Sequence, residues 1–348
     1  MQELSKFEGQ LKRVVVEEAH QLLTSILFRP KLQRVLELVR LCPRALFVSA
    51  SVPPSMLEDL LKQVELPPHR CVSIRSNAPD GLHLQYGVTR ATSRELAFFQ
   101  CKSAIEDWCR RSSGSARCLV FVLTREDCVQ FARTLATLSD VRVEQYQAGV
   151  PAASRTEVIE SLSRQCAEKQ TVIVATSSLG VGVDIADVSA VFHLGGALSL
   201  LDYRQQCGRG GRSGQKCKCE WFQWPDVLKT VLYIKSVSQR SQWERIEELE
   251  LYVGNSGGCR RAMLSSSSET SSASCKQIKS SGLAVELCDN CELAETTLPH
   301  NGTCAAFMTV HSSCKPDSTW CTGKTTKKLG SWSTSQRSRS YSTLHPPN

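Results

Sequence analysis

The feature that most constrains the fold is an ordered series of apolar runs and turns in residues 171–214. Its first run, Thr171–Val174, is β-branched, and a second run follows at Ala190–Leu194. Both runs are typical of strands that are buried on both faces. Further strand and helix patterns precede them, at Cys118–Leu123, Arg125–Leu135 and Val141–Tyr146. This alternation predicts an α/β fold with a parallel, doubly wound sheet.

The same stretch ends on a run of glycines and arginines, Gln205–Arg212 (QQCGRGGR). Arg209 and Arg212 each offer a planar fork of donors that cannot lose its charge. The glycines between them let a second surface approach the backbone closely. The run therefore predicts a contact with a polyphosphate. A Gly-Arg-rich surface loop is the alternative, although such loops do not follow two core strands.

Two carboxylates follow a run of valines near the start of the chain. Val14–Val16 predicts a strand, and Glu17 and Glu18 come at its carboxyl end. Ligands bind at that end of an open parallel sheet, where paired acids can hold Mg²⁺ through its waters and orient an attacking water. The alternative is a strand that leads into a solvated helix start, where glutamates favour the helix dipole.

A second strand pattern begins at Ala45 and ends on small hydroxyl residues, Ser49 and Ser51, before prolines and a helix pattern at Met56–Gln63. Together these runs resemble the motifs of superfamily 2 helicases. The arginine run resembles the sixth motif, which faces ATP bound on a neighbouring lobe. Residues 175–184 resemble the fifth motif, and residues 49–51 resemble the Ser-Ala-Thr third motif.

The acids resemble the DEAH-type second motif, here Glu17-Glu18-Ala19-His20. Glutamate for aspartate moves the first carboxylate out by about 1.5 Å, which predicts weakened activity. The resemblance implies catalytic roles for Glu17, Glu18, His20, Gln205, Arg209 and Arg212. It implies ATP and Mg²⁺ contacts for Glu17, Glu18, Gly182, Asp184, Arg209 and Arg212. It implies that Phe28, Arg29, Ser49, Ser51 and Thr176 couple DNA binding to hydrolysis.

Two features narrow the resemblance to RecQ-like DNA helicases. Phe28-Arg29-Pro30 resembles the end of an aromatic loop that senses single-stranded DNA in that family, although the expected tryptophan is missing. After the sixth motif come Cys259, Cys275 and the pair Cys288 and Cys291. A Cys-x-x-Cys pair with two earlier cysteines predicts a tetrahedral Zn²⁺ site, and RecQ helicases place a four-cysteine zinc subdomain here. Scattered free cysteines in a linker are the alternative.

The predicted organisation has four parts. Residues 1–90 form the back half of a first RecA-like lobe, 91–225 a complete second lobe, 226–291 a helical zinc-binding subdomain, and 292–348 a disordered, basic Ser/Thr-rich tail. No GxxxxGK[ST] run precedes residue 11, so the phosphate-binding loop of the family is not found. This indicates an N-terminally truncated chain, either a fragment of a longer helicase or a decayed copy, with a missing N-terminal half or a partner helicase.

Composition bounds the class of protein. Seventeen cysteines without a signal-peptide pattern indicate a reducing compartment, no apolar run approaches a membrane span, and the net charge of +8 suits an anionic partner. The leading interpretation is an ATP-dependent 3′–5′ DNA helicase acting on single-stranded and duplex DNA in the nucleus, in repair or recombination. The alternatives are a nucleic-acid-binding remnant that hydrolyses nothing, and an RNA helicase.

Overall fold

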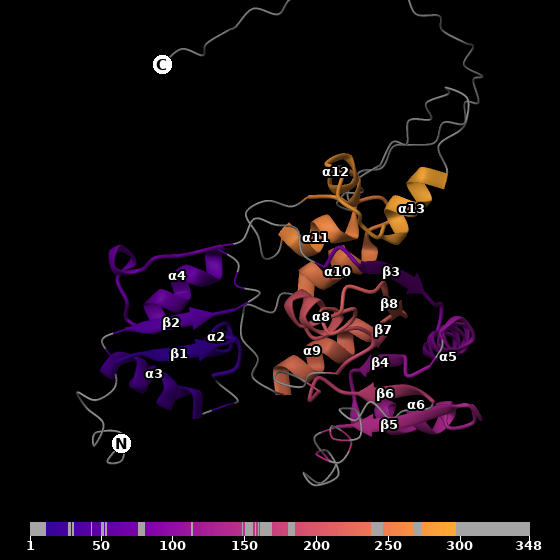
Figure 1. Cartoon of the computed structure of the whole chain (residues 1–348). Coiled ribbons are helices and arrows are strands. Elements are labelled where there is room, and N and C mark those ends of the chain that lie inside the picture. Colours follow the sequence, from indigo (N-terminus) through magenta and orange to yellow (C-terminus); the bar gives the residue numbers. More distant parts are fainter. Residues whose placement is uncertain are drawn as a thin grey trace, which may run out of the picture. The chain divides into compact units, whose positions relative to one another are not determined.

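The computed structural model describes residues 12–26, 29, 31–42, 44–49, 52, 54–75, 81–112, 114–147, 149, 156, 158, 160, 169–179, 185–237, 246–266 and 273–296. These residues contain two parallel sheets, one of two strands and one of six (Figure 1). A group of short helices follows the larger sheet in the sequence. No helix in the described ranges is both long and apolar enough to cross a membrane.

The six-stranded sheet has the order β3-β8-β7-β4-β6-β5, and every neighbouring pair is parallel. Its strands are β3 (Leu84–Arg90), β4 (Arg117–Val122), β5 (Val141–Tyr146), β6 (Gln170–Ala175), β7 (Val188–Leu194) and β8 (Cys217–Gln223). All six residues of β4 are buried, as expected for a strand covered on both faces. The predicted parallel α/β fold is confirmed.

Alternate residues of β4 belong to two different cores. Leu119 and Phe121 pack in one hydrophobic cluster, and Cys118 and Val120 pack in the other, because successive side chains of a strand point to opposite faces. The helices that cover the faces begin at hydroxyl caps, which accept a hydrogen bond from a backbone N–H of the first turn. They are α5 (Arg94–Arg111), α6 (Arg125–Leu135) and α8 (Leu200–Cys207), capped by Ser93, Thr124 and Ser199.

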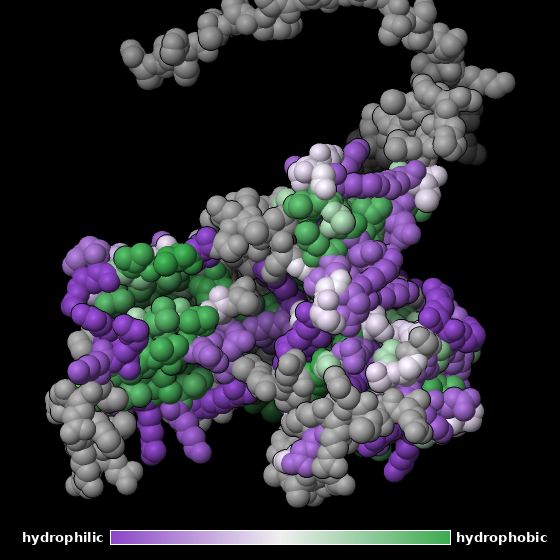
Figure 2. Space-filling view, viewed as in Figure 1, coloured by the Kyte–Doolittle hydropathy of each residue, from purple (hydrophilic) through white to green (hydrophobic). Residues whose placement is uncertain are grey.

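The smaller sheet pairs β1 (Val14–Glu17) with β2 (Ala45–Val48). Val14 and Val16 are buried in a third cluster, to which α3 (Lys31–Leu41) and α4 (Pro54–Gln63) contribute, next to the short α2 (Gln21–Thr24). The opposite face exposes 55% of Val15, 52% of Leu46 and 46% of Val48. Figure 2 shows apolar side chains gathered over this part of the molecule. Parallel sheets are ordinarily covered on both faces, and this one is covered on one within the described residues.

Within the described residues, the helices after β8 are α9 (Val227–Val237), α10 (Ile246–Gly254), α11 (Arg260–Ser266), α12 (Cys275–Ser280) and α13 (Asp289–Thr296). Helix α13 runs past residue 291, where the sequence analysis ends the zinc-binding subdomain. The boundary at residue 90 also differs from the observed sheets, because β3 pairs with β8 and so belongs to the second sheet. The predicted tail beyond Thr296 and the start of the chain before Lys12 lie outside the described residues.

We expect Gly196→Ala to destabilise the second sheet more than Gly214→Ala does. Both glycines have positive φ, 106° and 86°, but a Cβ on Gly196 would lie 2.1 Å from the buried Trp221 ring, whereas a Cβ on Gly214 would meet nothing within 4 Å. Backbone strain costs each variant about 1–2 kcal/mol, and overpacking adds about 1–3 kcal/mol at Gly196 alone. Urea unfolding followed by tryptophan fluorescence measures the difference, and equal losses would contradict the packing argument.

Candidate functional site

The predicted acids lie at the carboxyl end of β1. Glu17 is the last residue of the strand and is exposed, and Glu18 follows it, partly buried and with φ of 49°. A positive φ is strained for a residue with a side chain, and such strain is frequent at functional sites. The Glu18 carboxylate lies 3.3 Å from Nδ1 of His20.

His20 joins two further predicted residues, Ser49 and Gln205, in one hydrogen-bonded group. Its Nδ1 lies 2.9 Å from Oγ of Ser49, at the end of β2, and its Nε2 lies 3.0 Å from Nε2 of Gln205, on α8. An amide nitrogen only donates, so Nε2 of His20 accepts from Gln205 and the ring proton is on Nδ1. The ring is neutral, because burial lowers the pKa of His20 to about 4 against the raising effect of the Asp202 carboxylate.

Arg209 is on the turn that follows α8 and is 9% exposed. Burial raises the pKa of the Glu18 carboxyl, the Arg209 guanidinium opposes this, and Glu17 adds to it. The structure therefore brings Arg209 close enough to the acids for their charges to interact. Arg212 is on the same turn but is exposed. Gly211 lies between them with φ of 63°.

The remaining predicted residues are only partly described. Oγ1 of Thr176, just after β6, lies 2.8 Å from Oγ of Ser178. Arg29 donates from Nη1 to Oε1 of Gln21 at 2.9 Å. Phe28, Ser51, Gly182 and Asp184 lie outside the described residues, so their predicted roles stay predictions.

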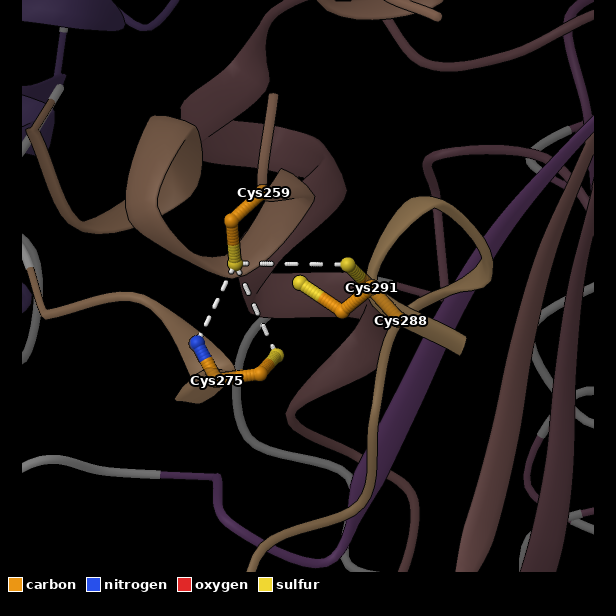
Figure 3. A group of neighbouring side chains, drawn as sticks. All are labelled: Cys259, Cys275, Cys288 and Cys291. Atoms are coloured by element: carbon orange, nitrogen blue, oxygen red, sulfur yellow. Dashed lines mark hydrogen bonds between the residues drawn. The ribbon is translucent and has the colours of Figure 1, made fainter. Parts of the chain in front are cut away.

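The four predicted metal ligands come together (Figure 3). The Sγ atoms of Cys259, Cys275, Cys288 and Cys291 all lie within 4.8 Å of one another, with 3.6 Å between Cys259 and Cys275 and 3.9 Å between Cys259 and Cys288. Zn–S bonds of about 2.3 Å in a tetrahedron place sulfurs about 3.8 Å apart. The four thiols therefore fit a tetrahedral Zn²⁺ ion.

The proximity of the cysteines also shifts the pKa of Cys291. Burial raises the pKa of the Cys291 thiol, and its neighbours Cys288 and Cys259 raise it further. Several thiolates so close together repel one another unless a cation lies between them. Metal binding reverses that balance, because a coordinated thiol loses its proton.

Two residues beside the cysteines had no role in the sequence analysis. Arg260 is 2% exposed, and its Nε donates to Oδ1 of Asp289 at 2.6 Å. The other oxygen of Asp289 accepts from the backbone N–H of Val88, on β3, at 3.1 Å. The available signal was their position, directly after Cys259 and Cys288, but nothing local predicts that they pair. Asp202, whose charge raises the pKa of His20 against the effect of burial, was missed in the same way.

Comparison with known proteins defines the class. Residues 101–214 match the family model of the helicase conserved C-terminal domain. The fold resembles Mss116p bound to single-stranded RNA and AMP-PNP, with a TM-score of 0.54 and 18% identity over 72% of this chain and 52% of that one. That identity shows a shared fold alone. The second sheet and its helices have a RecA-like α/β fold, and residues 101–214 within them match the helicase family model.

The relatives are RecQ-type DNA helicases. ATP-dependent DNA helicase Q5 of Mus musculus is 38% identical over 122 residues, which is 35% of this chain and 12% of that protein. A putative ATP-dependent DNA helicase Q1 of Caenorhabditis briggsae is 25% identical over 265 residues, which is 74% of this chain and 40% of that protein. The chain is thus similar to RecQ-type DNA helicases over part of its length, and it spans less than half the length of these relatives.

We expect the chain to bind one Zn²⁺ through the cysteine cluster. Cys288→Ser should lower the affinity by more than about 100-fold, because it removes a ligand, whereas residues outside the first coordination shell typically change affinity 10–100-fold. Competition with a chromophoric chelator measures it. The matched control is Cys109→Ser, a half-buried cysteine on α5, which should leave zinc binding unchanged. Equal zinc content in both variants would contradict the assignment.

Stability should fall as the pH drops from about 6.5 to 4, in part because of His20. Its pKa is about 4 in the folded chain against an ordinary 6.5, so the unfolded state binds the proton first, at a cost of up to about 3 kcal/mol. His20→Gln should flatten this part of the profile of unfolding free energy against pH. The unfolding free energy of the variant should still depend on pH, because burial lowers the pKa of His193 to about 3.

The control for this measurement is His69→Gln, because the His69 side chain is exposed. This variant should keep the wild-type slope of unfolding free energy against pH. An unchanged slope in His20→Gln would show that His20 is not held neutral in the folded chain.

Proposed function

We propose that this chain carries the arginine side of the ATP site of a RecQ-like DNA helicase, which hydrolyses ATP to move 3′–5′ along single-stranded DNA and unwind duplex DNA. The observation that carries the proposal is the His20–Gln205 hydrogen bond at 3.0 Å. This hydrogen bond links the segment after β1 to α8. Helix α8 is followed by the turn that carries Arg209 and Arg212, residues 208–214, here called the arginine turn. Across the same junction, the positive charge of Arg209 lowers the pKa of the Glu18 carboxyl, against the raising effect of burial.

The residues suit the parts of a phosphoryl-transfer site. Glu18 is a carboxylate with a raised pKa, which favours a general base that orients water. Arg209, buried on its turn, is suited to stabilise charge on a transferring phosphate. Glu17 would hold Mg²⁺ through water, and the ion would neutralise phosphate charge. The neutral His20 would connect Gln205 to Ser49 through the hydrogen bonds of its two ring nitrogens.

No GxxxxGK[ST] run precedes the acids in these 348 residues, so the proposed ATP site would need a phosphate-binding loop from another stretch of polypeptide. We propose that it belongs to the N-terminal half of a RecA-like lobe, and that this half covers the face of the first sheet that exposes Val15, Leu46 and Val48. Parallel sheets need such a cover. The zinc cluster would hold the helical subdomain together.

A second candidate is a nucleic-acid-binding remnant that hydrolyses nothing, and the missing phosphate-binding loop favours it. The net charge of +8 suits phosphate contacts in either case. DNA as the substrate rests on the RecQ-type relatives, and a nuclear location rests on that substrate. Imaging of a fluorescently tagged chain tests the location.

The deciding experiment measures phosphate release by the purified chain with MgATP and single-stranded DNA, alone and with a polypeptide that carries the phosphate-binding half of a RecQ-type lobe. Arg209→Ala and Arg212→Ala should each lower DNA-stimulated turnover by about 10³-fold or more, the range of arginine fingers. The control is Arg110→Ala, an exposed arginine on α5 that pairs with Asp107. Its turnover should be unchanged.

Polarity is tested on duplexes with a single-stranded tail. We expect unwinding of a 3′-tailed duplex and none of a 5′-tailed duplex. Tight, salt-dependent DNA binding without phosphate release, even with the added polypeptide, would establish the remnant instead. Full turnover in Arg209→Ala would refute the role of that arginine.

A further inference from the structure

The outer edge of β3 is covered by the described residues of 259–296, here called the cysteine subdomain, rather than by another strand. The backbone N–H of Val88 donates to Oδ2 of Asp289 at 3.1 Å, and the carbonyl of Leu84 accepts from Nη2 of Arg261 at 2.7 Å. Just before the strand, the carbonyl of Leu82 accepts from the N–H of Glu286 at 2.8 Å. Exposed strand edges otherwise invite pairing with other chains.

Asp289 links this edge to the cysteine cluster itself. It lies between Cys288 and Cys291, and its Oδ1 accepts from Nε of Arg260, the residue after Cys259, at 2.6 Å. One carboxylate therefore touches two cysteine-bearing segments and the edge strand. An ion held by all four thiolates would fix the two cysteine-bearing segments relative to one another. It would thereby fix the Asp289 carboxylate, which accepts the hydrogen bond of the Val88 N–H.

The segment from Leu82 to Leu84, which precedes and begins β3, contacts the arginine turn on its other side. Nε2 of His83 donates to the carbonyl of Gly210 at 3.3 Å, and the carbonyl of His83 accepts from the N–H of Cys217 at 3.0 Å. A Cβ on Gly211 would lie only 2.3 Å from the His83 ring. Gly210 and Gly211 separate the two arginines of the turn, so His83 packs directly against its backbone.

A second link runs between the end of the turn and the subdomain. Nζ of Lys216 lies 2.6 Å from Oε2 of Glu286, and Glu286 is also the residue whose N–H reaches Leu82. The segment from Leu82 to Leu84 is thus held on one side by the cysteine subdomain and contacts the arginine turn on the other. A displacement of the subdomain must move or release that segment.

We propose that metal occupancy of the cysteine cluster sets the conformation of the arginine turn, with Asp289 and His83 as the positioning residues that connect them. The inference rests on the proposed function only in treating the arginine turn as an ATP contact. The coupling between the cysteine cluster and the turn is measured without ATP. Its physical content is a reciprocal free-energy coupling between two sites through one packed segment.

Hydrogen–deuterium exchange of the whole chain tests the coupling, with Zn²⁺ bound and after chelation. Removing the metal should speed exchange in residues 81–90 and 208–217 by about 5- to 150-fold, the usual range of allosteric coupling, and leave β2 unchanged. Unchanged exchange in 208–217 would overturn the proposal, even if 81–90 loosened. Equal loosening of every segment would also overturn it, since the metal would then act on stability alone.

Variants of the zinc-loaded chain give an independent test. His83→Ala should keep the zinc content and the protection of 84–90 but speed exchange in 208–217, and His83→Asn, which restores a donor, should reverse part of the effect. Asp289→Ala should loosen both segments. The matched control on α13 is Glu295→Ala, an exposed residue that pairs with Lys279. Slow exchange in 208–217 of His83→Ala would exclude His83 as the connection.

Discussion

Parallel strands must be covered on both faces and protected at their edges, and most of this structure follows from how that requirement is met. The six-stranded sheet places β4, its most buried strand, at the centre and packs a separate core against each face. Its β3 edge is paired with side chains and backbone of the cysteine subdomain. That subdomain is therefore part of the sheet's architecture as well as a candidate metal centre.

The junction between the acids and the arginine turn depends on an imidazole that carries no charge. A neutral ring has one donor and one acceptor, and His20 uses the donor toward Ser49 and the acceptor toward Gln205. A protonated ring would have two donors and would lose the contact with the amide nitrogen. Burial of His20 is thus what lets the two halves of the site meet through a hydrogen bond.

The sequence predicted the elements whose patterns are local and strong. Helix α6 and strand β5 begin and end where the apolar periodicity places them. Strand β3 was missed because polar residues and Gly87 interrupt its pattern. Packing requires glycine at position 87, because a Cβ there would lie 2.6 Å from the carboxylate of Glu220.

The candidate site was predictable as residues but not as geometry. Motif resemblance named His20 and Gln205 separately, and no local pattern shows that side chains 185 positions apart share a hydrogen bond. The cysteines were named from their spacing and position. The pairing of Arg260 with Asp289, and of Asp289 with β3, depends on tertiary packing that a single sequence does not encode in any short window.

The pairing of β3 with β8 also has a consequence for biosynthesis. Thr89 and Glu220, bonded across these two strands, are 131 positions apart. A ribosome that adds about 5–20 residues per second needs roughly 7 to 26 s to make that interval. Throughout it the nascent β3 lacks both β8 and the cysteine subdomain, which cover its two edges in the folded chain, so both edges stay open to pairing with other chains.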